Sequence, residues 1–242
     1  MPEETSPDEI RSLTMSIWEH INELRKRLVV AAAAFLVACV VTFYVAPNLM
    51  DILAVPIGGL DKLQAVEVTE SLGVFIRISL LAGFILSLPI LVYEVMAFVA
   101  PGLTDAERRY IYIAIPFIVL MFLAGVAFTY FVMLPAAIPF LVTFMNIKNV
   151  PRVSSYVDFT TNLMFWIGIS FEMPIVVFLL AKLGFVSPRM LLGGWRYAIV
   201  IIAIAAAVIT PTADPFNMML LMAPLILIYF LSILMAVIAR RK

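Results

Sequence analysis

Six long apolar runs dominate the pattern of hydrophobic and polar positions along the chain. A helix that crosses a bilayer needs about 20 apolar residues at a rise of about 1.5 Å per residue. The runs cover 28–46, 72–98, 110–134, 159–181, 197–210 and 216–239. The pattern therefore predicts an all-α polytopic membrane protein with six transmembrane helices. The fifth run is short, so either it thins the bilayer locally or it forms a shallow hairpin with the sixth.

Four of these runs contain a proline, which removes one backbone hydrogen bond and bends the helix around it. The positions are Pro89, Pro116, Pro174 and Pro224. We therefore expect a bent, concave bundle that forms one integral membrane domain over 1–242 and begins with a cytoplasmic amphipathic segment at 1–27. The stretches 47–71 and 135–158 are predicted to fold over the helix ends as short interfacial helices.

Composition supports the membrane assignment and excludes several classes of protein. Apolar residues make up 64% of the chain and charged residues 13%, against about 45–50% and 25% in soluble domains. The 16 basic and 16 acidic side chains balance, which argues against a nucleic-acid partner. A single cysteine, Cys39, and a single histidine, His20, permit neither an internal disulfide nor a histidine metal cluster.

Lysine and arginine are distributed unevenly between the two sets of loops. Twelve lie in the N-terminal segment, the second and fourth loops and the C-terminal tail, and three lie in the alternate loops. Because basic loops stay in the cytoplasm, we expect both termini to be cytoplasmic. The acidic start of the chain is not typical of a signal peptide, so the first span is predicted to remain as an anchor.

Sequence motifs for catalysis are missing. The chain has no Gly-rich phosphate loop, no HExxH and no GxSxG, and the six apolar runs contain no aspartate for intramembrane proteolysis. We therefore expect a protein that is not an enzyme and that holds no cofactor or metal.

The segment 18–27 is the first candidate for binding. As a helix it places Ile21 and Leu24 on one face and Glu23 and Arg27 on another. Two interpretations remain open. Glu23 forms an ordinary i,i+4 pair with Arg27, which contributes a few tenths of a kcal/mol, or Glu23 is an anion that awaits a cationic ligand.

The connection between the second and third spans is the second candidate. Pro101 and Gly102 predict a turn, and Thr104 followed by Glu107 matches a capping box that starts the third span. Capping explains Glu107 fully on structural grounds, and a binding role would be additional.

Glu172 lies deep in the fourth run, roughly 20 Å of helix from Phe159. An acidic residue at the membrane centre is unfavourable by about 2.5–3.5 kcal/mol and is by default a functional candidate. The 4-3-4 spacing of Thr161, Phe165, Gly168 and Glu172 predicts one helix stripe in which the small glycine lets a neighbouring helix or water approach. The alternative is a neutral, hydrogen-bonded structural acid.

Other polar positions have sufficient structural explanations. Asp214 fits an N-cap that starts the sixth span, and Ser187 fits the N-cap of a short cytoplasmic helix. Arg77 and Glu94, near opposite ends of the second span, are long enough to reach the membrane interface.

Four segments in order resemble the TatC family, the receptor subunit of the twin-arginine protein translocase. They are His20-x-x-Glu23-Leu24-Arg25-x-Arg27, Phe98-x-Ala-Pro101-Gly102-Leu103 with Glu107, Phe171-Glu172-x-Pro174, and Ile209-Thr210-Pro211-x-x-Asp214. The resemblance runs from about Trp18 to Ala239 and implies a glove-like bundle in the cytoplasmic (inner) membrane. Met96 and Phe230 depart from the tryptophan and glutamate of many relatives.

The resemblance implies that the chain binds the twin-arginine signal peptide of folded cargo. The signal-binding glutamates would be Glu23 and Glu107, and the surrounding binding residues would be Arg25, Phe98, Pro101 and Leu103. A guanidinium offers planar paired donors to a carboxylate and a lysine ammonium does not, so two carboxylates could explain a preference for two arginines.

The resemblance also implies partners and a role for the intramembrane acid. The single-span TatA and TatB proteins would contact spans five and six, near Thr210, Asp214 and Met218, and further copies of the chain would join the assembly. Glu172 would keep the concave face hydrated and perturb the bilayer, or it would contact the inserted signal or a partner helix. The alternatives are a proton-coupled small-solute carrier that uses Glu172 and a scaffold for other membrane proteins.

Overall fold

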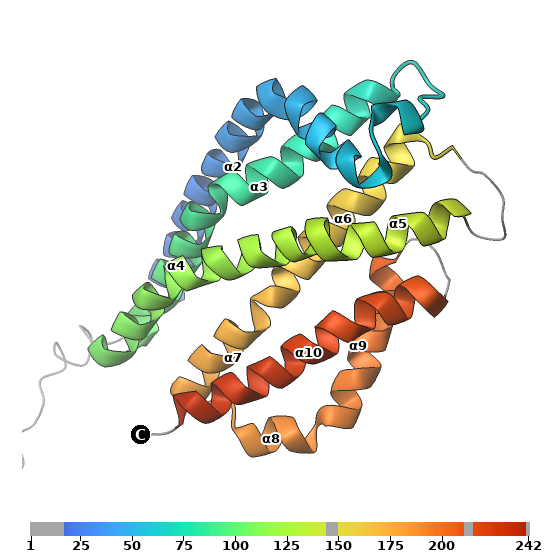
Figure 1. Cartoon of the computed structure of the whole chain (residues 1–242). Helices are drawn as coiled ribbons and strands as arrows, with labels where there is room; N and C mark the ends of the chain where they lie inside the picture. The colour runs from blue at the N-terminus through green and yellow to red at the C-terminus, as the bar shows by residue number, and fades with distance from the viewer. Residues whose placement is uncertain (1–16, 144–149, 211–214, 241–242) are drawn as a thin grey trace, which may run out of the picture.

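The computed structural model consists of helices joined by short connections (Figure 1). It describes residues 17–143, 150–210 and 215–240, and within these ranges no β-strand is present apart from an isolated bridge between Gln64 and Arg152. The helices are α2 (Ile17–Ala54), α3 (Glu70–Val99), α4 (Asp105–Phe128), α5 (Leu134–Thr143), α6 (Val153–Phe171), α7 (Met173–Lys182), α8 (Pro188–Gly193), α9 (Trp195–Ile209) and α10 (Pro215–Ala239). The predicted all-α class is confirmed.

In the described part of the chain, five helical segments are long and apolar enough to cross a membrane. The predicted fifth span is α9, whose 15 residues cover only about 22 Å. It packs against α10, and α10 packs in turn along α7 (Figure 1). The chain therefore has the predicted polytopic architecture, with a short helix in the fifth position.

The helix ends around the first and third spans differ from those predicted. α2 runs without interruption from the amphipathic segment through Pro47 to Ala54, so the first eight residues of the expected interfacial stretch 47–71 belong to α2. The expected interfacial helix after the third span is a continuation of that span, because α4 passes through a π-helical turn, η4 (Thr129–Met133), directly into α5. Short 3-10 turns, η1 (Val55–Ile57) and η2 (Leu60–Lys62), follow α2.

The fourth span is broken where proline predicts it. α6 ends at Phe171 and α7 begins at Met173, so Glu172 stands between the two helices. Pro174 has no N–H to donate to the Ser170 carbonyl, and the Glu172 N–H donates to the carbonyl of Ile169, three residues back, at 3.0 Å. Pro89, Pro116 and Pro224, in contrast, lie inside helices that continue past them.

Close helix contacts depend on glycine. A Cβ on Gly83 of α3 would lie 2.9 Å from the backbone N and Cα of Cys39 on α2, and a Cβ on Gly125 of α4 would lie 2.8 Å from Cα of Gly168 on α6. The predicted role of Gly168 in admitting a neighbour is confirmed: the neighbour is α4.

The end of α2 is anchored by tyrosines from two other segments. The last carbonyls of a helix have no partner within it, and here the Tyr156 hydroxyl donates to the Leu53 carbonyl at 2.6 Å while the Tyr130 hydroxyl donates to the Ile52 carbonyl at 2.8 Å. Tyr156 is itself buried. These bonds fix α2 against η4 and α6.

A buried carboxylate connects the segments around the start of α3. Glu70 accepts hydrogen bonds from the backbone N–H groups of Val66 and Ser154, each at 2.8 Å. Arg152 lies 3.0 Å from Glu67 and 3.5 Å from Glu70. The hydrogen bond to Glu67, followed by the charge of Glu70, raises the pKa of Arg152. This end of the bundle is thus tied together by polar contacts.

Candidate functional site

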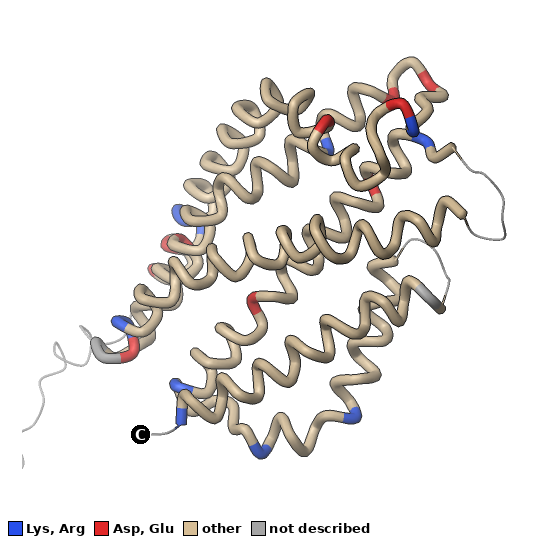
Figure 2. The backbone as a smooth tube through the Cα atoms, viewed as in Figure 1, with Lys and Arg blue, Asp and Glu red and all other residues tan. Residues whose placement is uncertain are grey.

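Figure 2 shows most of the Lys, Arg, Asp and Glu residues near the two ends of the long helices, with long tan stretches between them. At the end where α2 begins, Glu23 and Arg27 form the predicted i,i+4 pair, since Arg27 Nη2 and Nε lie 2.8 Å and 3.1 Å from Glu23 Oε1. Arg27 Nη1 also donates to Glu94 Oε2 on α3 at 3.0 Å. The pair is therefore part of a three-residue bridge between α2 and α3.

The bridge borders a hollow of about 630 Å³. Its charged lining consists of Glu19, Glu23, Lys26, Arg27 and Glu94. The second Glu23 oxygen, Oε2, is buried and accepts no hydrogen bond within the described residues. Glu94 was predicted only to reach the interface, so its place in this hollow is new information from the structure.

The start of α2 also contacts the end of α3 through aromatic stacking. The His20 ring lies on the Phe98 ring with centroids 4.3 Å apart and an interplanar angle of 22°. The turn η3 (Ala100–Gly102) follows α3 directly. The structure thus brings the two segments that carry the candidate motifs to one end of the bundle.

Glu107 forms the capping box that its spacing predicts. One carboxylate oxygen, Oε2, accepts hydrogen bonds from the Thr104 backbone N–H at 2.9 Å and the Thr104 hydroxyl at 2.7 Å. These contacts start α4 immediately after the Phe98 segment. Glu107 is therefore held in a defined orientation while its side chain stays partly accessible.

The remaining candidates around this end differ in exposure. Arg25 and Pro101 are exposed, while Phe98 and Leu103 are half-buried. Leu103 packs with Met96 of α3 against a small buried cluster that contains Ile111 of α4. The end of the bundle thus presents an exposed arginine and proline beside a partly apolar surface.

Glu172 is the acidic side chain at the break in the fourth span. Both of its carboxylate oxygens are buried, and no side chain in the described part of the chain donates a hydrogen bond to them. Two members of the predicted stripe contact the bundle interior. Thr161 is buried, and the Phe165 ring packs edge-on against the Phe84 ring of α3, with the ring centroids 5.2 Å apart. A structural acid at this position would have to be hydrogen-bonded by a backbone donor, such as that of Phe122 on α4.

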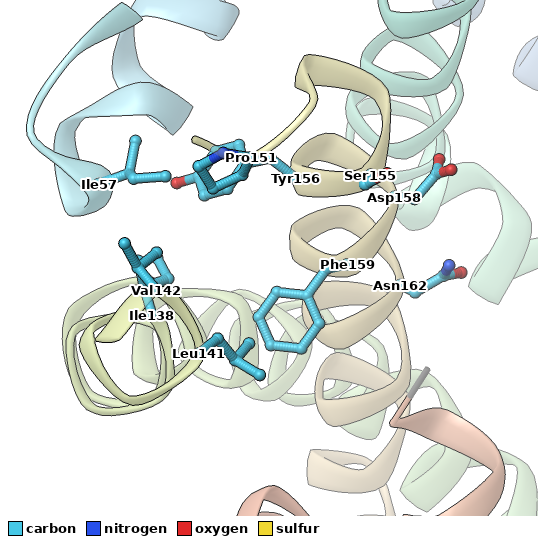
Figure 3. Close-up of a pocket in the computed structure, with 10 residues that line it drawn as sticks. All are labelled: Ile57, Ile138, Leu141, Val142, Pro151, Ser155, Tyr156, Asp158, Phe159 and Asn162. Atoms are coloured by element: carbon cyan, nitrogen blue, oxygen red, sulfur yellow. The ribbon is translucent and has the colours of Figure 1, made fainter. Parts of the chain in front are cut away.

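The two faces of α6 line two different hollows. Figure 3 shows Phe159 pointing toward Leu141 of α5 in a largely apolar pocket of about 480 Å³. Asp158 and Asn162 also line this pocket, but their side chains point to the other side of α6. There they line a hollow of about 700 Å³ together with Arg77 of α3, and Arg77 forms an ion pair with Asp158. Arg77 is thus an interhelical partner and does more than reach the interface.

The candidates near the last two helices are only partly described. Thr210 is buried and its hydroxyl donates to the Ala206 carbonyl at 2.8 Å. Met218 is half-buried against the main core. Asp214, predicted as the N-cap of the sixth span, lies outside the described residues, although α10 begins at Pro215 as the pattern predicts. Ser187 does cap its short helix, α8, by accepting the Met190 N–H at 3.1 Å.

Comparisons with known proteins agree with this arrangement. Residues 19–224 match the family model described as Sec-independent protein translocase protein (TatC). The chain belongs to the TatC family. The TatC protein of Carboxydothermus hydrogenoformans is 34% identical over 92% of this chain and 93% of its own length, and that of Deinococcus radiodurans is 34% identical over 97% and 91%.

A solved TatC structure has the same fold. The crystal structure of the twin-arginine translocase receptor TatC superposes with a TM-score of 0.82 at 36% identity, over 92% of this chain and all of that one. The assignment makes this chain a multi-pass membrane component of protein translocation. It favours the translocase hypothesis and gives no support to the solute carrier.

Proposed function

We propose that this chain is the receptor subunit of the twin-arginine translocase and binds the signal peptide of folded cargo through Glu23 and Glu107. The observation that carries the proposal is the placement of these two carboxylates, from α2 and α4, at one end of the bundle, where the stacked His20 and Phe98 rings join the two segments. Arg25, Phe98, Pro101 and Leu103 would complete the proposed site.

Both carboxylates are already oriented by neighbours. Arg27 holds Glu23, and the backbone and hydroxyl of Thr104 hold Glu107. An oriented carboxylate loses little conformational entropy on binding, and a guanidinium forms paired hydrogen bonds with it that a lysine ammonium cannot match. The geometry therefore favours a ligand with two arginines over one with two lysines.

The same proposal places the binding end in the cytoplasm. The twelve-to-three distribution of basic residues supports an arrangement with both termini cytoplasmic, so the site faces newly folded precursors in the cytoplasmic membrane. TatA and TatB would bind at the short helix α9 and at α10, near Thr210, Asp214 and Met218. The exposed apolar side chains of α9, including Tyr197, offer a surface for a single-span partner.

Glu172 has a separate role in this proposal. Its buried carboxylate at the break between α6 and α7 would bring water into the concave face or contact the inserted signal. Replacement of Glu172 by Gln should reduce transport. It should leave signal capture by Glu23 and Glu107 intact. Unchanged transport and unchanged partner assembly in Glu172→Gln and Glu172→Ala would exclude this role.

The receptor function is tested by capture of signal peptides. The wild-type chain, Glu23→Ala and Glu107→Ala are each exposed to a crosslinkable twin-arginine peptide and to its twin-lysine version. We expect the wild type to retain the twin-arginine peptide preferentially and both variants to lose most of that capture. Equal capture of the two peptides by the wild type, or full capture by both variants, would refute the proposal.

A further inference from the structure

We propose that Glu94 is a second carboxylate for a signal arginine, and that Arg27 occupies the position of that arginine in the empty receptor. The incoming guanidinium would replace Arg27 between Glu23 and Glu94. This inference rests on the proposed function, because it concerns the ligand of the same site.

The geometry of Arg27 shows how a guanidinium is held in the hollow. Its Nη2 and Nε donate to Glu23 Oε1 at 2.8 Å and 3.1 Å, and its Nη1 donates to Glu94 Oε2 at 3.0 Å. The two carboxylates come from different helices and point at one planar fork. A lysine at the same place has a single nitrogen and does not reproduce this paired arrangement.

The charges around the hollow favour an exchange of one cation for another. Arg27 stands between the carboxylates of Glu23 and Glu94, which both line the hollow. Exchange of Arg27 for a signal arginine keeps the bridge between α2 and α3 electrically unchanged. The bound state therefore needs no new buried charge.

Arg27 is the most exposed member of the bridge. Its side chain is 27% exposed, against 19% for Glu23 and 13% for Glu94, and it is attached one helical turn after Glu23, so it can turn toward water without burying its charge. Glu23 Oε2, which is buried and accepts no hydrogen bond within the described residues, gives an incoming guanidinium an acceptor that Arg27 leaves unused. The signal arginine thus gains a contact that its competitor lacks.

The test measures peptide affinity with the purified full-length chain in detergent. Glu94→Gln should weaken binding of a twin-arginine peptide by about tenfold, the effect of one lost charge-assisted hydrogen bond, and should change twin-lysine binding by less than about twofold. Arg27→Lys keeps the charge but loses the fork, so it should tighten twin-arginine binding by about threefold. Glu67→Gln, which removes an ion-paired carboxylate at the other end of α3, should leave both affinities unchanged.

Two results would overturn the inference: wild-type affinity in Glu94→Gln, or weaker twin-arginine binding in Arg27→Lys. If Glu94→Gln lowers the melting temperature, Arg27→Lys decides alone, because a gain of affinity cannot come from misfolding. Failure of the receptor function is distinguishable, since Glu23→Gln and Glu107→Gln would then also bind like the wild type. If those two variants bind weakly and Glu94→Gln does not, only the inference about Glu94 fails.

Discussion

Gly83→Ala is the substitution that most directly tests the packing of α2 on α3. The added Cβ would lie 2.9 Å from the backbone N and Cα of Cys39, and 2.7 Å from its Sγ. Rotation of the Cys39 side chain would relieve the sulfur contact only. The two backbone contacts require α2 and α3 to separate by about 0.5 Å to reach an ordinary distance of 3.4 Å.

The expected cost follows from two opposing effects. Overpacking of this kind costs about 1–3 kcal/mol, and replacement of glycine by alanine in a helix returns up to about 1 kcal/mol. We expect a net loss of about 1–2 kcal/mol, which lowers the apparent melting temperature by about 2–8 °C in a chain of this size. Because α2 carries Glu23 and α3 carries Glu94, the same separation should weaken signal-peptide binding.

The assay is thermal loss of helical circular dichroism in detergent, with Gly73→Ala as the matched control. Gly73 lies on the same helix, and a Cβ there meets no atom within 4 Å. The control should melt at or slightly above the wild-type temperature. If Gly83→Ala and Gly73→Ala melted at the same temperature, close backbone contact between α2 and α3 would be refuted.

Two further predictions concern the opposite end of the bundle. Tyr156→Phe removes the buried hydrogen bond to the Leu53 carbonyl and should destabilise the chain by about 1–2 kcal/mol, whereas the exposed Tyr44→Phe should leave the melting temperature unchanged. Glu70→Gln replaces a charged acceptor of backbone N–H groups, including that of Ser154, by a neutral one. It should cost about 1–3 kcal/mol and speed limited proteolysis of the adjacent loops, and an unchanged cleavage rate would contradict its anchoring role.

The apolar runs predicted the number and order of the long helices, because the thickness of the bilayer sets the number of consecutive apolar residues that a spanning helix needs. They predicted helix ends less well. Pro47 suggested the end of the first span, yet α2 continues past it to Ala54. The apolar stretch after Met133 suggested a separate interfacial helix, yet the backbone continues through a π-helical turn. Both ends depend on contacts with other helices, which periodicity does not contain.

The candidate site was predictable in its local contacts only. Spacing within one helix predicted the Glu23–Arg27 pair and the Glu107 capping box, since i,i+4 and capping geometry are local. Glu94 was missed as a partner of Arg27, because the sequence does not specify which helices are neighbours. The available signal was that the acidic Glu94 lies near the cytoplasmic end predicted for the second span, and the basic Arg27 lies at the same predicted end of the first span. Asp158 was missed as the partner of Arg77 for the same reason.

The central claim is that Glu23 and Glu107 recognise the two arginines of a signal peptide, and a double-mutant cycle in binding affinity tests it most directly. Peptides with two arginines or two lysines are titrated against the wild type and against Glu23→Gln, and in parallel against Glu107→Gln. We predict that each glutamate substitution weakens twin-arginine binding by about tenfold and twin-lysine binding much less, which gives a coupling of about 1 kcal/mol or more. Equal losses for both peptides, with zero coupling, would contradict the account.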